Sequence, residues 1–213
     1  MPVPLFEFPP IPMLSAHRLA CVRGDRRLFS ALSLSVSPGE WLHVRGANGA
    51  GKTSLLRLLA GLAQPAEGEV LWGGQSIHSD DGVYRRNLLF LGHQGALKED
   101  LSAQESLLFS AAIDGFDLSI DAAANALFKV GLTGSEDLPV RCLSAGQKRR
   151  VMLARLVSRA AKLWILDEPF TALDVKAVEM LEGIIAEQVS VGGMVVMTSH
   201  QAVAIPDGRV LQL

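Results

Sequence analysis

The chain has 213 residues and a formal net charge of −2, so its charge gives no reason to expect nucleic acid as a partner. Although 49% of the residues are hydrophobic, no window reaches the roughly 18 uncharged apolar residues of a membrane-spanning helix, and we expect that the chain does not cross a bilayer. This length suits one sizeable α/β core with room for an inserted subdomain, rather than two full domains.

Short apolar segments and turn signals divide the chain. Residues 1–13 contain five prolines and are predicted to be a flexible tail. Turn residues and apolar runs predict strands at residues 14–22, 32–36, 41–44, 68–72 and 88–91. Helical periodicity predicts helices at residues 54–60, 103–112 and 121–130. Since no strand is predicted between the last two helices, we expect a helical subdomain at about residues 96–160, inserted into a core that spans residues 14–213.

A phosphate-binding loop is the clearest single motif. The segment from Gly46 to Thr53 reads GANGAGKT and fits the pattern G-x-x-x-x-G-K-[ST] in full. It follows the predicted strand at 41–44 and precedes a predicted helix, which is the context that the motif requires. In such a loop backbone amides approach the β-phosphate, Lys52 reaches the β- and γ-phosphates, and the Thr53 hydroxyl can ligate Mg²⁺. Without this loop, Lys52 would be an ordinary surface lysine.

A second informative stretch begins at Ser144. Ser144 is a favourable N-cap for a helix that extends to about residue 160, and the free amides beside Gly146 predict an anion site. An unbroken apolar strand at 163–166 then delivers Asp167 and Glu168 at its carboxyl end, where open α/β sheets bind ligands. Taken alone, each of these features has a commoner interpretation: an ordinary capped helix, and carboxylates that are merely solvated at the end of a strand. The basic cluster at 148–150 is interpreted as a solvated face of this helix.

The C-terminal part predicts a helix at residues 175–189 and a strand at 194–198 that ends beside His200. His200 would then share a sheet edge with Asp167 and Thr53, although a histidine in such a place is more often structural. A Gln just past a strand end, as Gln94 is, is likewise more often only solvated. The last residues, 202–205 and 209–213, are predicted to form a hairpin around a Pro-Asp-Gly turn.

Together these motifs resemble those of the ATP-binding-cassette (ABC) ATPases. The phosphate loop, Gln94, LSAGQ at 143–147, LWILDE at 163–168, Asp174 and His200 occur in the order and spacing of that family. More narrowly, NLLFLGHQGALKEDL, LSAGQKRR, WILDEPFTALDV and TSHQ are similar to the ATP-binding subunits of bacterial exporters for cytochrome c biogenesis. The resemblance covers nearly the whole chain from Leu14 onward.

This resemblance implies an α/β fold, namely a P-loop NTPase domain of the ABC type with N-terminal antiparallel strands and an inserted helical subdomain. It implies a general base at Glu168, with His200 and Lys52 also catalytic, and Mg²⁺ held by Thr53, Gln94 and Asp167. The implied ATP-binding residues are Arg23, Gly46, Asn48, Gly49, Gly51, Lys52, Thr53, Ser54 and Gln94.

The resemblance also implies partners. Ser144, Gly146 and Asp174 would contact the ATP held by the opposite subunit, so the ATP state would be a homodimer. Integral membrane permease subunits of cytochrome c maturation would complete a complex at the cytoplasmic face of the bacterial inner membrane. ATP hydrolysis would then drive haem export or release of a haem chaperone. Two alternatives stay open: the ATPase of another ABC exporter, and an ATP-gated assembly clamp with low turnover.

Two positions depart from the general family pattern. Ala145 stands where many relatives have glycine, a small change that leaves Gly146 free to approach a phosphate. Arg23 stands where many relatives place an aromatic side chain that stacks on adenine. A guanidinium can also stack on a base, but the preference for adenine over guanine is open.

Overall fold

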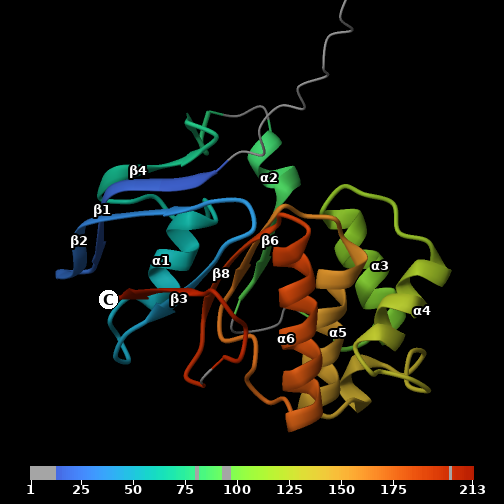
Figure 1. Cartoon of the computed structure of the whole chain (residues 1–213). Helices are drawn as coiled ribbons and strands as arrows, with labels where there is room; N and C mark the ends of the chain where they lie inside the picture. The colour runs from blue at the N-terminus through green and yellow to red at the C-terminus, as the bar shows by residue number, and fades with distance from the viewer. Residues whose placement is uncertain (1–12, 80–81, 93–96, 202) are drawn as a thin grey trace, which may run out of the picture.

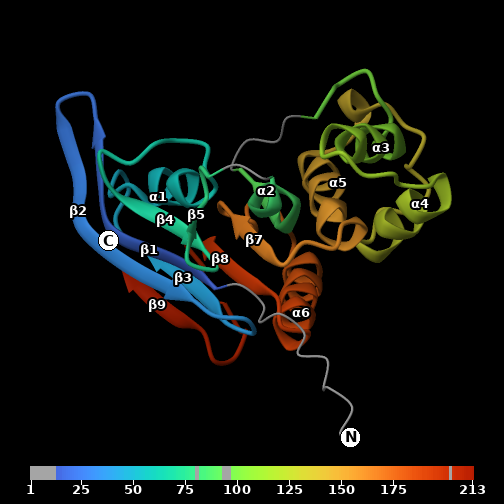
Figure 2. The ribbon, with the colours of Figure 1, turned by 90° about the horizontal axis from the view of Figure 1, so that it is seen from above.

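Two β-sheets of different character organise the chain. The computed structural model describes residues 13–79, 82–92, 97–201 and 203–213. Within these residues, one sheet has the strand order β2-β1-β4-β5 with antiparallel pairs, and the other has the order β6-β7-β8-β3-β9 with parallel pairs. Figures 1 and 2 show the antiparallel sheet at one end of the molecule, the parallel sheet in the middle and helices α3–α5 at the other end. This arrangement confirms the predicted fold class.

The parallel sheet forms the centre of the core. Two of its three inner strands, β7 and β8, are buried at every position, as expected for strands covered on both faces. In β7, Leu163 and Ile165 pack into one hydrophobic cluster, while Trp164 and Leu166 pack into the other. The strands of this sheet are β3 (Trp41–Arg45), β6 (Leu88–Leu91), β7 (Leu163–Leu166), β8 (Met194–Thr198) and β9 (Arg209–Gln212).

Helix α1 (Lys52–Leu59) fills the space between the two sheets. Its buried leucines, among them Leu55 and Leu56, share a hydrophobic cluster with residues of β1, β3, β4, β7 and β8. On the opposite face of the parallel sheet, helix α6 (Val175–Ser190) buries Leu181 and Ile185 in the second cluster. The antiparallel sheet consists of β1 (Leu14–Arg23), β2 (Arg26–Val36), β4 (Glu67–Trp72) and β5 (Gln75–Ser76).

Three helices form the inserted helical part of the fold. They are α3 (Ala103–Ile113), α4 (Ile120–Lys129) and α5 (Ala145–Ser158), with a 3₁₀ turn at Val140–Cys142 before α5. Each helix begins at a serine whose hydroxyl accepts a hydrogen bond from a free backbone amide: Ser102, Ser119 and Ser144. Such capping explains why these helix starts could be predicted from the sequence.

Several predicted elements needed correction. The second strand is longer than predicted and starts at Arg26, because it pairs with β1 up to the hairpin turn. The predicted C-terminal hairpin was wrong: Arg209–Gln212 instead lies parallel to β3 at the edge of the central sheet. The short elements β5 and α2 (Val83–Asn87) were not predicted. The predicted tail, apart from Met13, lies outside the described residues.

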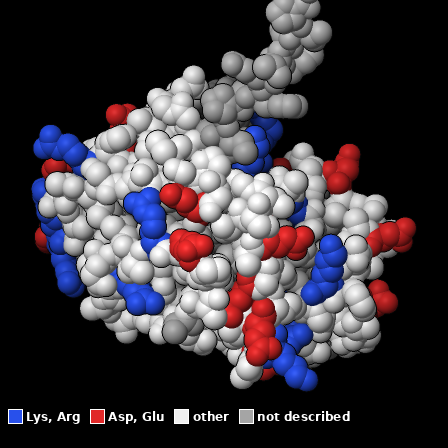
Figure 3. Space-filling view, in the orientation of Figure 1, with Lys and Arg blue, Asp and Glu red and all other residues white. Residues whose placement is uncertain are grey.

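Charged side chains are distributed unevenly over the surface. In Figure 3 the acidic side chains lie mostly over the helices on the right of the view, whereas basic ones gather along the edge formed by the β1–β2 hairpin. None of the helices in the described ranges combines the length and apolarity that a bilayer crossing needs.

Candidate active site

A glycine-containing loop between β3 and α1 forms the floor of the site. At its end, Gly51 precedes α1 with φ of 103°, in the left-handed region that favours glycine. A Cβ on Gly51 would also lie 3.2 Å from Leu28 and Phe29 of the neighbouring strand. The loop therefore closes tightly and presents the first amides of α1 to the cavity, where they can bind an anion.

Lys52 lies over this loop. Its Nζ donates hydrogen bonds to the carbonyl oxygens of Gly46 at 2.8 Å and Ala47 at 3.3 Å. These two bonds hold the ammonium group above the loop, next to the amides. A positive charge held in this place adds to the attraction of the helix N-terminus for a phosphate.

Asp167, directly after β7, connects β8 and helix α1 at the back of the cavity. Its side chain is only 2% exposed, and it accepts hydrogen bonds from the hydroxyls of Thr53 and Thr198, each at 2.8 Å. Thr198 in turn accepts a hydrogen bond from the backbone amide of Glu168 at 2.8 Å. The sequence analysis missed Thr198, although its place at the carboxyl end of a buried strand was a usable signal.

Glu168 and His200 face each other at the open side of Asp167. The backbone amide of His200 donates to Glu168 Oε2 at 3.2 Å, and His200 Nε2 lies 3.4 Å from Glu168 Oε1. The second contact lacks hydrogen-bond alignment, so the buried Oε1 receives no hydrogen bond from a described residue. Glu168 has φ of 50°, which is rare for a residue with a side chain and is typical of strained functional positions.

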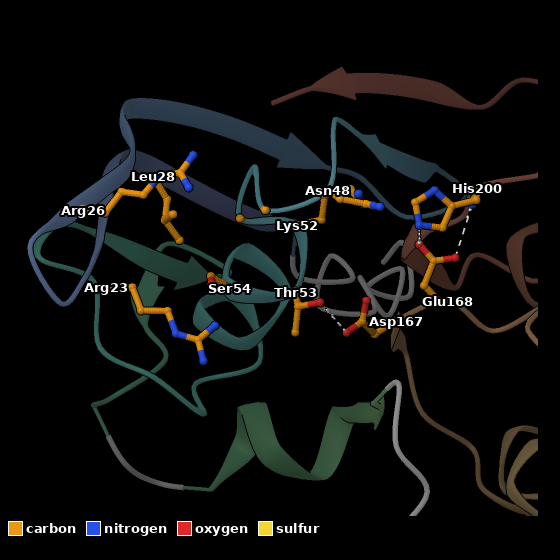
Figure 4. Close-up of a pocket in the computed structure, with 12 residues that line it drawn as sticks. Arg23, Arg26, Leu28, Asn48, Lys52, Thr53, Ser54, Asp167, Glu168 and His200 are labelled. Carbon is orange, nitrogen blue, oxygen red and sulfur yellow. Dashed lines mark hydrogen bonds and ion pairs between the residues drawn. The ribbon is translucent and has the colours of Figure 1, made fainter.

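A cavity of about 500 Å³ brings most of the predicted residues together (Figure 4). The predicted residues that line it are Arg23, Asn48, Gly49, Gly51, Lys52, Thr53, Ser54, Asp167, Glu168 and His200. Arg26 and Leu28 also line it and were not predicted. Gly46 is part of the loop beneath, and Gln94 lies outside the described residues.

The three residues predicted to act across a dimer do not line this cavity. Ser144 is exposed, and its hydroxyl caps α5 by accepting a hydrogen bond from the Gln147 amide at 3.2 Å. Asp174 caps α6 and pairs with Arg150 at 3.2 Å. Within one chain, therefore, the loop with Lys52 and the helix start at Ser144 form two separate surfaces.

The predicted solvated face at 148–150 was wrong for Arg149. Its side chain is only 6% exposed, and it donates hydrogen bonds to the carbonyl oxygens of Pro169, at 3.1 Å, and Glu168. Burial lowers the pKa of Arg149, while the negative charges of Asp167 and Glu168 act in the opposite direction. The sequence did hold a signal, because Arg149 shares the helix face of Met152, Leu153 and Leu156.

His43 is another buried side chain that the sequence analysis did not identify. It is 1% exposed on β3, and its Nε2 lies 3.2 Å from the carbonyl oxygen of Ser199, directly before His200. Arg45 donates a hydrogen bond to Nδ1 at 3.2 Å, so Nε2 carries the ring proton. Burial lowers the pKa of His43 and favours this neutral form.

For a metal ion, the site offers a few oxygen atoms rather than a preformed cluster of ligand side chains. No group of three or more His, Cys, Asp or Glu side chains in the described part of the chain could hold a metal ion. Thr53 and Asp167 instead place a hydroxyl and a carboxylate 2.8 Å apart beside the loop. One or two such protein ligands, completed by phosphate oxygens, suit Mg²⁺.

The fold and the site define an ABC-type ATP-binding domain. Among solved structures, a putative ABC transporter ATP-binding protein from Pyrococcus furiosus superposes with a TM-score of 0.82 at 24% identity, covering 94% of this chain and 97% of that one. A dimeric ATP-binding cassette in a post-hydrolysis state, bound to ADP and Pi, gives a TM-score of 0.81 at 23% identity over 94% of both chains.

Sequence comparison places the chain more narrowly. The family model for ABC transporters matches residues 29–171, and the chain belongs to this family as one of its ATPases. It is 55% identical, over 90% of both chains, to the cytochrome c biogenesis ATP-binding export protein CcmA of Nitrosomonas europaea. It is 47% identical to CcmA of Escherichia coli K12, over 94% of this chain and 95% of that one. These similarities confirm the resemblance predicted from the motifs.

Proposed function

We propose that the chain is the ATP-hydrolysing subunit of a membrane complex that serves cytochrome c biogenesis. The observation that supports ATP hydrolysis is the position of Asp167 and Glu168, which lie with His200 at one edge of the phosphate-loop cavity. The pathway is supported by the similarity to CcmA proteins over about nine-tenths of the chain.

ATP binding is assigned to the loop and its surroundings. The triphosphate would lie on the amides at Gly49 and Gly51 and on the Lys52 ammonium, with Gly46, Asn48 and Ser54 completing the loop. Lys52 would exchange its hydrogen bonds to the loop carbonyls for phosphate oxygens, because its side chain is already held above the loop. Arg23, at the hairpin end of the cavity, would contact the base.

Thr53 and Asp167 would hold Mg²⁺, with Gln94 as a third ligand. When bound, this ion neutralises the charge that develops on the phosphates. The Thr198 hydroxyl fixes Asp167 Oδ1 at 2.8 Å and thereby orients Oδ2 toward Thr53 and the loop.

Glu168 is assigned as the general base. Its buried Oε1 has lone pairs that no described side chain engages by a hydrogen bond, so it can accept a proton from an attacking water. His200 holds the other carboxylate oxygen through its backbone amide, which leaves its exposed ring able to contact the γ-phosphate. Phosphoryl transfer to water needs this positioning more than it needs covalent chemistry.

Hydrolysis would require two chains. Ser144 and Gly146 are surface positions at the start of α5, separate from the cavity, so they could meet ATP only when another chain supplies it. A head-to-tail homodimer would bring the α5 start of one chain over the loop of the other, with Asp174 at their shared surface.

Integral membrane subunits would be the coupling partners, and the chain would act at the cytoplasmic face of a bacterial inner membrane. A groove of about 520 Å³ runs between the ends of α1 and α2 and the helices α3 and α5. It is lined in part by Leu62 and Ile113, whose exposed fractions are 53% and 68%. A cytoplasmic segment of a membrane subunit seated there would contact the core and the helical part at once.

The hydrolytic proposal is tested by Mg²⁺-dependent phosphate release from the chain purified together with its membrane partners. Lys52→Ala should abolish turnover, and Glu168→Gln should abolish turnover while ATP binding is kept and a dimer accumulates with ATP. Glu179→Gln, on the exposed surface of α6, is the matched control and should turn over ATP normally. Full activity of Lys52→Ala or Glu168→Gln would contradict the proposal.

The partner proposal is tested by purification of the tagged chain from solubilised membranes, followed by mass spectrometry. Membrane proteins of cytochrome c maturation should be recovered, and Ile113→Asp should lose them while keeping the ATP affinity of the unchanged chain. Recovery of the permease of another exporter would refute the pathway but leave the ATPase intact.

A further inference from the structure

One face of β3 holds the segment that follows β8. Trp41, His43 and Arg45 alternate along the strand, so their side chains lie on the same face of the sheet. Trp41 Nε1 donates a hydrogen bond to the carbonyl oxygen of Pro206 at 2.8 Å, and the rings of Trp41 and His43 stack with their centroids 6.1 Å apart. The His43 ring is therefore held by its neighbours on the strand, with Nε2 directed at the chain after β8.

The hydrogen bond of His43 reaches a particular peptide group. His43 Nε2 donates to the carbonyl oxygen of Ser199 at 3.2 Å. The N–H of the same peptide group belongs to His200 and donates to Glu168 Oε2, also at 3.2 Å (Figure 4). Because a peptide group is planar, its carbonyl and its N–H turn together. Fixing the Ser199 carbonyl therefore fixes the direction in which the His200 amide points, which is toward Glu168.

Arg45 determines which nitrogen of the His43 ring can donate. Its Nε donates to His43 Nδ1 at 3.2 Å, so Nδ1 accepts and Nε2 carries the ring proton. If Nδ1 carried the proton instead, the lone pair of Nε2 would face the lone pairs of the Ser199 carbonyl. Hydrogen bonds that are joined in such a chain polarise and strengthen one another where water is excluded. The chain runs from Arg45 through His43 and one peptide group to the carboxylate of Glu168.

A purely structural role would require only that the buried His43 ring be paired. The ring is 1% exposed, and a hydrogen bond to any nearby carbonyl would satisfy it. The carbonyl that it contacts, however, belongs to the peptide group that holds Glu168. Among the described residues, the amide of His200 is the one hydrogen-bond donor to the Glu168 carboxylate. The direction of this single donor therefore decides how the carboxylate is turned.

We propose that His43 is a positioning residue for Glu168 and acts through the peptide group between Ser199 and His200. The inference rests on the proposed role of Glu168 as general base. His43 does not line the cavity, so its effect on the reaction is indirect. It makes the His200 amide a fixed donor, which keeps Glu168 Oε2 bound and leaves Oε1 directed to an attacking water.

The matched variants His43→Met and His43→Gln test this role in the chain purified with its membrane partners. The two new side chains have nearly the same length and volume, but only glutamine can donate to the Ser199 carbonyl. We expect His43→Met to lower kcat for phosphate release at least about fivefold with the KM for ATP unchanged, because a displaced catalytic group costs rate rather than binding. His43→Gln should keep kcat within about twofold of the unchanged chain, because the donor is kept. The control Leu181→Ala, buried in α6, should lower the Tm and leave kcat unchanged.

Amide hydrogen exchange at His200, followed by NMR in the full chain without ATP, gives a readout that does not depend on turnover. Exchange should be faster in His43→Met than in the unchanged chain or in His43→Gln, because the hydrogen bond to Glu168 loosens. Unchanged exchange or unchanged kcat in His43→Met would overturn the positioning role, and so would an equally low kcat in both variants. Faster exchange in His43→Met, together with an unchanged chain that releases no phosphate, would support the positioning of Glu168 and contradict the proposed hydrolysis.

Discussion

Replacing Arg149 with methionine tests how Glu168, the proposed general base, is held in place. The guanidinium reaches from α5 to the carbonyl oxygens of Glu168 and Pro169, just after β7. Glu168 has a left-handed backbone with φ of 50°, a conformation that costs about 1–3 kcal/mol and persists only when its surroundings fix it. Methionine keeps a similar length and apolar stem but cannot donate to either carbonyl.

The expected loss of stability follows from these two bonds. A hydrogen bond from a charged donor contributes about 1.5–3 kcal/mol, so the pair contributes roughly 3–6 kcal/mol. Burial of the cation, which lowers the pKa of Arg149, offsets part of this gain, and a net loss of about 2–3 kcal/mol remains. For a chain of this size such a loss lowers the Tm by roughly 5–10 °C.

The expected loss of activity is larger than the loss of binding. A displacement of about 1 Å at a catalytic group can cost around a hundredfold in rate. We therefore expect kcat of Arg149→Met to fall at least tenfold, with the KM for ATP nearly unchanged, because the phosphate loop is untouched. Steady-state phosphate release and thermal unfolding measure the two effects, and Lys148→Met, on the same helix, is the control. A kcat within twofold of the unchanged chain, with a Tm shift below about 2 °C, would refute this role.

Three further substitutions test other parts of the core. Thr198→Val should raise the Mg²⁺ concentration needed for half-maximal turnover and cost about 1–3 kcal/mol in urea unfolding, because it leaves Asp167 Oδ1 without its buried donor; an unchanged Mg²⁺ dependence would contradict this. Burial lowers the pKa of His43 below its ordinary value of 6.5, so the stability that the neutral ring confers is present above about pH 6.5 and is lost as the pH falls through the lowered pKa. In His43→Gln the free energy of unfolding should not show this loss between about pH 7 and 5. If the free energies of unfolding of both proteins changed with pH in parallel, the proposed role of the neutral His43 ring would be disproved. Gly208→Ala should destabilise the fold and change tryptophan fluorescence, since its Cβ would lie 2.0 Å from the Trp41 ring; native fluorescence and Tm would show that the ring can move at no cost.

Features encoded by neighbouring residues were predicted well. The phosphate loop, the serine-capped helix at Ser144 and the unbroken strand before Asp167 were all identified, because caps, glycine turns and apolar periodicity act over a few residues. Since parallel strands end at one edge of a sheet, the meeting of Asp167 with Thr53 and His200 was also predictable, because each residue closely follows the carboxyl end of a predicted strand.

Contacts between distant segments were decided only by the tertiary structure. A basic residue on a helix looks solvated in sequence, and only the packing of α5 against the segment after β7 buries Arg149. The sequence pattern of the last strand suits a hairpin as well as it suits a strand beside β3. Its parallel pairing with β3 was therefore decided by the free edge of the central sheet. Arg26 joined the cavity because the hairpin register carries it there. Local sequence thus determined the phosphate loop, the helix caps and the positions of the two carboxylates. Packing between distant segments decided which side chains hold these groups in place, because it joins residues that no short sequence pattern relates.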